Sequence, residues 1–290
     1  PEGKKELRVN GFKSEKNLVG VLEATGRHYF PGFKEWTGKI KDPRDPELIE
    51  YSLSVLLWTA LVSLITKQGS RLAITCRMRP SSQLLENLKE LALDQNLEHV
   101  PHGDTVEYLL RRLDVSSLEK LQVQLIQRLL RQKILDPHRL LGKYHTLAID
   151  GVHVHSFDYE HCKHCLVTRD AGAKKRWFHA KLQASLVTPA GLCFAVCSEW
   201  IQNEGPVYDK QDCELKAIRR LLEKIRKYFP KLSLCILLDA LYSGQPTRDL
   251  IKHHGMEYIV VFKEGNNPWA GRFESVPIST DHQYTGTSSY

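Results

Sequence analysis

The sequence predicts an α/β fold in which a mixed sheet flanked by helices follows an all-helical N-terminal region. Two observations carry this prediction. Up to about residue 140 the apolar residues recur at helical spacing, whereas from Tyr144 onward they form short strand-like runs. Two of these runs, 147–149 and 232–238, end in an aspartate, Asp150 and Asp239 respectively. The chain has 290 residues, of which 42% are hydrophobic, so it can bury a large core.

Charge and cysteine content narrow the class of protein. Lys and Arg (41) outnumber Asp and Glu (34), and the net charge of +7 with a pI near 9.0 suits a nucleic-acid partner. The seven cysteines, an odd number, favour free thiols in a reducing compartment. The polar start of the chain predicts no signal peptide, and the longest apolar stretch, 53–65, is too short to span a bilayer. We therefore expect a cytoplasmic protein without a membrane partner.

The N-terminal region, 1–140, is predicted to be helical from Glu47 onward. Apolar residues at helical spacing, interrupted by turn residues, occur at 48–65, 84–91, 106–113 and 118–134. Asp104, with Glu107 three residues later, predicts a capping box at the start of the third helix.

The second region, 141–274, is predicted to be a mixed sheet. Strands are expected at 145–155, 177–187, 192–200, 232–238 and 258–262, and helices at 212–229 and 246–254. The short links between the first three strands indicate an antiparallel meander, and the later helices indicate crossovers to parallel strands. This order, with acids at the ends of the first and fourth strands, is the ribonuclease-H-like arrangement. The polar tail, 275–290, is predicted to be disordered.

Asp150 and Asp239 are the candidate catalytic and metal-binding residues. In the predicted sheet the first and fourth strands are neighbours, so the two carboxylates converge and repel each other. A divalent cation relieves this repulsion, and oxygen ligands with open positions suit Mg²⁺ or Mn²⁺. Such ions support phosphodiester hydrolysis and strand transfer. The competing interpretation of each aspartate, taken alone, is a turn or helix-capping residue.

Two further features have a functional and a structural interpretation each. Cys162 and Cys165 form a Cys-x-x-Cys pair close to three histidines, which permits a zinc knuckle. No second pair lies at zinc-finger spacing, so the alternative is a polar hairpin tip beside the active site. The helix 212–229 has a basic face, which is either a DNA-contacting surface or a solvated helix face.

Several segments resemble DDE transposases of the IS4-like group of bacterial insertion sequences. They are DPRDPELIEYSLSVLLWTAL, HGDTVEYLLRRL, LAIDGVHVHSF, CKHCL, WFHAKLQASLVTP, QDCELKAIRRLL and LDALYSGQPTRDLIKHHGMEYIVVFKEG, within about residues 30–270. The resemblance implies that Asp150 and Asp239 are the first two acids of the catalytic triad. It also implies that the N-terminal region binds DNA or assists assembly, and that the partners are transposon terminal repeats and target DNA. A homodimer on DNA and a location at the bacterial nucleoid follow from the same resemblance.

The third acid of that family is a glutamate on a helix after the last strand, and no helical pattern follows Phe262 here. Glu264 and Glu274 lie outside any predicted helix, and Glu214 is interpreted as a first-turn acid of its helix. C-terminal truncation is therefore expected. The predicted function is a DNA transposase, or a fragment of one, that cleaves and joins DNA at insertion-sequence ends. The alternatives are an inactive DNA-binding remnant and a related metal-dependent nuclease.

Overall fold

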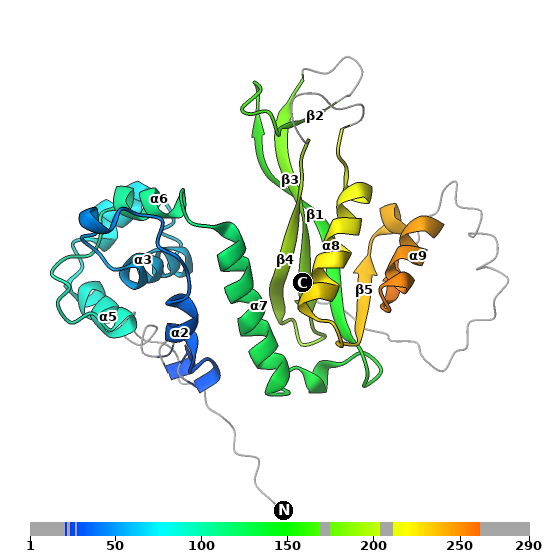
Figure 1. Ribbon diagram of the computed structural model, residues 1–290, viewed down its shortest axis with the longest axis horizontal. Helices are drawn as coiled ribbons and strands as arrows, with labels where there is room; N and C mark the ends of the chain where they lie inside the picture. Colours follow the sequence, from blue (N-terminus) through cyan, green and yellow to red (C-terminus); the bar gives the residue numbers. More distant parts are fainter. Residues whose placement is uncertain (1–20, 22–23, 27, 169–174, 204–210, 262–290) are drawn as a thin grey trace, which may run out of the picture. The chain divides into compact units, whose positions relative to one another are not determined.

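The structure is a computed structural model that describes residues 21, 24–26, 28–168, 175–203 and 211–261 (Figure 1). The chain divides into two compact units, with the boundary between Ile134 and Leu135. The sequence placed this boundary near residue 140, and the predicted tail 275–290 lies outside the described residues.

The described part of the N-terminal unit is helical. Its helices are α2 (Phe33–Thr37), α3 (Leu53–Ile65), α4 (Arg71–Ala73), α5 (Ser82–Ala92), α6 (Gly103–Leu110) and α7 (Val115–Arg131), with a π-helical turn at Ile74–Met78. Serine side chains cap three of them: the Oγ atoms of Ser52, Ser70 and Ser81 accept hydrogen bonds from the first turns of α3, α4 and α5. Val55, Leu56, Leu88 and Leu109 have no exposed surface and form the centre of a single apolar core.

The predicted capping box at Asp104 is wrong. Helix α6 begins at Gly103, two residues earlier than a helix capped by Asp104 would, and its N-cap is His102, whose Nδ1 accepts a hydrogen bond from the Asp104 amide at 3.2 Å. The Asp104 carboxylate instead contacts Arg71 at 3.2 Å, and Glu107 contacts Arg71 at 2.8 Å. The reason is close packing against α4, because a Cβ atom at Gly103 would lie 2.9 Å from the Arg71 carbonyl carbon.

The second unit is built on a mixed sheet, as the sequence predicted. Its strands are β1 (His145–Phe157), β2 (Leu166–Val167), β3 (Trp177–Val187), β4 (Cys193–Ile201), β5 (Leu234–Leu238) and β6 (Glu257–Val260), and its helices are α8 (Glu214–Tyr228) and α9 (Gln245–His253). Strand β3 pairs antiparallel with β1, β4 and the short β2. Strand β5 pairs in parallel with β1 and β6. The main strand order is therefore β4-β3-β1-β5-β6.

Strand β1 runs through Asp150 and ends at Phe157, two residues beyond the end that the sequence predicted. The antiparallel ladder with β3 extends from Thr146↔Val187 to Phe157↔Trp177, and it keeps the segment after Asp150 extended. The parallel pairing with β5 stops at Ala148↔Leu237. Asp150 thus lies within β1 but just beyond the point where its parallel neighbour ends.

Helix α8 packs on β3 and β4 with an apolar face of five buried residues: Ala217, Ile218, Leu221, Leu222 and Ile225. Much of its opposite, basic face is engaged inside the unit. Arg220 binds Glu199 and Asp212 at 2.9 and 2.7 Å, and Lys224 binds Glu199 at 3.0 Å. Arg226 donates hydrogen bonds to five backbone carbonyls. These three side chains therefore stabilise the fold, and the predicted DNA-contacting role does not fit them.

Within the described residues, no helix has the length and apolar character needed to cross a membrane. All seven cysteines are free thiols.

Candidate active site

Asp150 and Asp239 lie at the same level of two neighbouring parallel strands. Ala148 pairs with Leu237, and each aspartate follows two residues later along its own strand direction. Side chains two residues apart along a strand project from the same face of the sheet. The two carboxylates therefore leave this part of the sheet on one side, and both residues are exposed.

Local hydrogen bonds orient both aspartates. The Oδ1 atom of Asp150 accepts a hydrogen bond from the Gly151 amide at 2.8 Å. Asp239 is the N-cap of a 3₁₀ turn, Ala240–Tyr242, and its Oδ1 accepts from the Leu241 amide at 3.0 Å. The capping interpretation of Asp239 is therefore correct. It does not exclude a second role, because the cap uses one of the two carboxylate oxygens.

Glu214, in the first turn of α8, reaches the same region. Its Oε2 accepts a hydrogen bond from the Tyr242 hydroxyl at 2.7 Å. Its carboxylate also presses against Gly151, because a Cβ atom built at Gly151 would lie 2.8 Å from Glu214 Cδ. The missing side chain of Gly151 thus admits Glu214 to strand β1, on the face opposite to the Asp150 side chain, since adjacent residues of a strand project from opposite faces.

Tyr242 is the buried hydrogen-bond partner of Glu214. Only 1% of its surface is exposed. Burial is the main cause that raises the pKa of Tyr242 well above its ordinary value. The hydrogen bond to Glu214 and the negative charges of Glu214, Asp239 and Asp150 raise this pKa further. The hydroxyl consequently stays neutral and donates a hydrogen bond to Glu214.

The arrangement of the acids is open. Among the described residues, the three carboxylates do not offer a set of oxygens that all lie within 4.8 Å of one another. Mg²⁺ does not require such a cage, because it retains several waters and binds proteins through one or two carboxylates together with phosphate oxygens. Exposed acids on one face of the sheet fit this type of binding.

The sequence pattern identified Asp150 and Asp239 as site residues but gave Glu214 only a structural role. Glu214 is a first-turn acid of its helix, as predicted, but it also contacts Gly151 and Tyr242. A glycine inside a strand often marks a close approach, so Gly151 was the available signal for such a neighbour. No spacing pointed to Tyr242. Glu264 and Glu274 lie outside the described residues.

Comparisons with known proteins agree with part of the sequence interpretation. Residues 35–126 match a family model described as DDE_Tnp_1-associated. No curated protein matches the chain. The chain is similar to a cryo-EM structure of the piggyBac transposase synaptic complex with hairpin DNA, with 11% sequence identity and a TM-score of 0.38. The match covers 89% of this chain and 54% of that chain, so the chain spans about half the length of the solved protein. This similarity is too low to assign the fold, which rests on the strand order.

Proposed function

We propose that the chain is a DDE-type DNA transposase, or part of one, with a ribonuclease-H-like catalytic unit. The order β4-β3-β1-β5-β6, in which an antiparallel meander is followed by two parallel strands, supports this fold. The match of residues 35–126 to the DDE_Tnp_1-associated model supports the family. Residues 264 and 274 lie outside the described chain, so the glutamate expected after the last strand plays no part in the proposal.

One observation carries the catalytic part of the proposal. Asp150 and Asp239 lie at matched positions of two neighbouring parallel strand segments and project from one face of the sheet. Acids that serve only to keep a surface hydrated need not lie close together. Clustered carboxylates repel one another unless a cation lies between them. The geometry therefore favours a cation site at Asp150 and Asp239.

The acids would hold Mg²⁺ or Mn²⁺. Two such ions about 3.5–4 Å apart supply an activated water or hydroxyl nucleophile and stabilise the leaving oxygen of a phosphodiester. The chain itself fixes the ligands: the Gly151 and Leu241 amides hold the two aspartates, and Tyr242 holds Glu214. These neutral donors orient the carboxylates without neutralising their charge.

DNA is the proposed substrate, in the form of insertion-sequence ends and target DNA, and the IS4-like group is the proposed family branch. The net charge of +7 favours a polyanionic partner. Lys181 lies on the same face of the sheet as Asp150, since its neighbour Gln183 is the register partner of Asp150. This lysine is placed to contact a phosphate near the acids. A homodimer assembled on DNA at the bacterial nucleoid belongs to the same proposal.

The test is Mg²⁺-dependent nicking of a duplex that carries the inverted repeats flanking the gene. Asp150→Asn and Asp239→Asn should each reduce the nicking rate at least about 100-fold, the loss typical of removing one electrostatic group from a catalytic site. The control is Asp249→Asn, an exposed acid of α9 in the same unit, which should leave the rate unchanged.

The outcomes separate the alternatives. Equal DNA binding with and without Mg²⁺, and no cleavage under either condition, contradicts catalysis and supports a DNA-binding protein. Cleavage of unrelated duplexes as fast as of the inverted repeats supports a metal-dependent nuclease. Nicking that survives both aspartate substitutions overturns the assignment of the site.

A further inference from the structure

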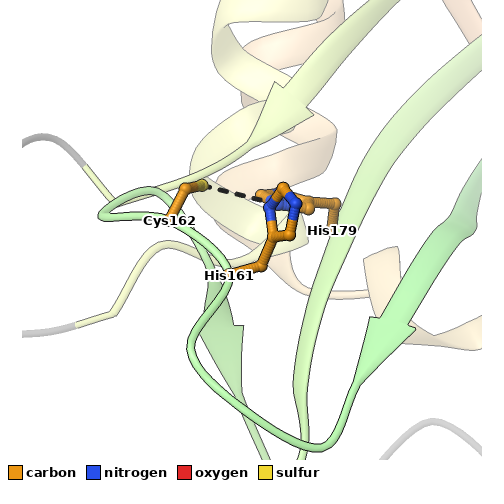
Figure 2. Close-up of side chains that lie close together, drawn as sticks. All are labelled: His161, Cys162 and His179. Atoms are coloured by element: carbon orange, nitrogen blue, oxygen red, sulfur yellow. Dashed lines mark hydrogen bonds between the residues drawn. The ribbon is translucent and has the colours of Figure 1, made fainter.

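The loop that follows β1 brings His161 and Cys162 close to His179 of β3 (Figure 2). The Sγ atoms of Cys162 and Cys165 lie 3.9 Å apart. The Nε2 atom of His179, on β3, lies 3.6 Å from the first sulfur and 3.5 Å from the second. A ring nitrogen of His161 belongs to the same group, because the ligand atoms of His161, Cys162 and His179 all lie within 4.8 Å of one another.

These separations are those of a tetrahedral zinc site. With Zn–S bonds of about 2.3 Å and Zn–N bonds of about 2.0–2.1 Å, two sulfurs of one tetrahedron lie about 3.8 Å apart, and a sulfur and a nitrogen about 3.6 Å apart. The three observed distances depart from these values by about 0.1 Å at most. Only His161 has to move closer, and it is an exposed side chain on a loop.

We propose that Cys162, Cys165, His179 and His161 bind one zinc ion. The Cys-x-x-Cys turn is already closed by a backbone hydrogen bond from the Cys165 amide to the Cys162 carbonyl at 3.1 Å. Soft thiolate and imidazole ligands select zinc over the hard cations suited to carboxylates. The cysteines lie farther apart than bonded sulfurs, which are about 2.05 Å apart, so they are arranged as two thiols and not as a disulfide.

The ligand set differs from the one that the sequence suggested. Three histidines flank the cysteine pair in sequence, but the ligand on β3 comes from fourteen residues beyond Cys165, where the antiparallel register places His179 opposite His155. Phe157 stacks on His161 with ring centroids 4.4 Å apart and 13° between the planes, which orients this imidazole. Four protein ligands leave no open position, so the ion is structural and not catalytic.

The site is connected to the start of α8. The buried Asn203 donates a hydrogen bond to the Cys165 carbonyl at 3.0 Å and accepts one from the Asp212 amide at 3.1 Å. Gln211 pairs with both backbone groups of Val167, just after the cysteine pair. Two residues after Asp212, Glu214 accepts the hydrogen bond of Tyr242. Zinc would therefore stiffen the support of this glutamate, but the proposal does not depend on the catalytic role of the acids.

The experiment measures bound metal in the full chain purified under reducing conditions. We expect one zinc per chain by elemental analysis. We also expect Co²⁺ to replace the zinc and to give thiolate charge-transfer bands together with the intense visible bands of tetrahedral cobalt. Cys162→Ser, Cys165→Ser and His179→Gln should each lower the metal affinity at least about 10-fold. The matched controls are Cys193→Ser, an exposed thiol of the same unit, and Asp150→Asn, and both should keep one zinc.

Two results would overturn the zinc proposal. If the wild-type chain holds no zinc and Co²⁺ titration gives no thiolate band, the proposal is overturned, whatever the variants do. Stoichiometric zinc that persists in the Cys162→Ser, Cys165→Ser double variant also overturns it. Because the cobalt spectrum is recorded on the wild-type protein, variants that fail to fold do not decide the outcome. If the wild-type chain binds zinc but does not nick DNA, the result contradicts the proposed function and not the zinc proposal.

Discussion

Replacing Gly151 with alanine tests whether Glu214 belongs to the acidic site. The new Cβ atom would lie 2.8 Å from Glu214 Cδ, whereas ordinary contacts begin at 3.4 Å, so the carboxylate carbon must retreat by at least 3.4 − 2.8 = 0.6 Å. The backbone itself accepts alanine, since Gly151 is not among the described glycines with positive φ. The substitution therefore acts on Glu214 and not on the strand.

The cost to stability should be modest. If Glu214 withdraws, the buried Tyr242 hydroxyl loses its acceptor, which costs about 1–3 kcal/mol. Alanine in a strand recovers about 0.5–1 kcal/mol relative to glycine. The net loss in free energy of unfolding is then about 0–2.5 kcal/mol. The effect on catalysis should be larger, because a displacement of about 1 Å at a catalytic group can reduce the rate about 100-fold.

The assays are urea unfolding and Mg²⁺-dependent nicking of the inverted-repeat duplex. Tyr242→Phe removes the same hydrogen bond without displacing Glu214 by contact, so it should lower stability similarly but slow nicking less. Gly244→Ala is the control for the glycine substitution, because its added Cβ would meet Pro246 at an ordinary 3.7 Å. If Gly151→Ala nicks DNA at the wild-type rate, Glu214 has no role in the site and the reasoning is refuted.

Two further predictions concern stability. Arg226→Lys should lower the free energy of unfolding by about 2–3 kcal/mol, because a lysine cannot reproduce the hydrogen bonds of the guanidinium to five carbonyls. Urea titration measures this loss, with the exposed Lys227→Gln variant as the control. Equal unfolding midpoints for the two variants would contradict the prediction. Burial is the main cause that lowers the pKa of His145 below 6.5. The positive charge of Arg139 lowers this pKa further, and the negative charge of Asp136 raises it by less. The unfolded chain therefore binds the proton more readily, so the contribution of neutral His145 is complete above about pH 6.5 and is lost as the pH falls through that value. His145→Asn should flatten the dependence of stability on pH between about pH 7.5 and about pH 5.5, and an unchanged slope would show that other groups cause it.

Local sequence patterns predicted the secondary structure well where neighbouring residues decide it. The strand expected at 177–187 has the predicted bounds, because apolar periodicity and the flanking turn residues determine them. The helix expected over 48–65 ends at Ile65 as predicted but begins only at Leu53, because the Ser52 side chain caps its first turn. The capping box at Asp104 failed because a tertiary contact between Gly103 and Arg71 sets the start of α6. The end of β1 was misplaced because its length follows from the partner strand β3.

The sequence by itself determined which chemical groups are available: two aspartates after apolar runs, and a Cys-x-x-Cys pair. These features depend on residues close together in the chain, where spacing translates directly into geometry. Only the tertiary structure decided which distant residues join them. Helix packing places Glu214 against Gly151, and strand register places His179 beside Cys162 and Cys165. Such pairings depend on how whole elements pack and align, and no short stretch of sequence encodes that alignment alone.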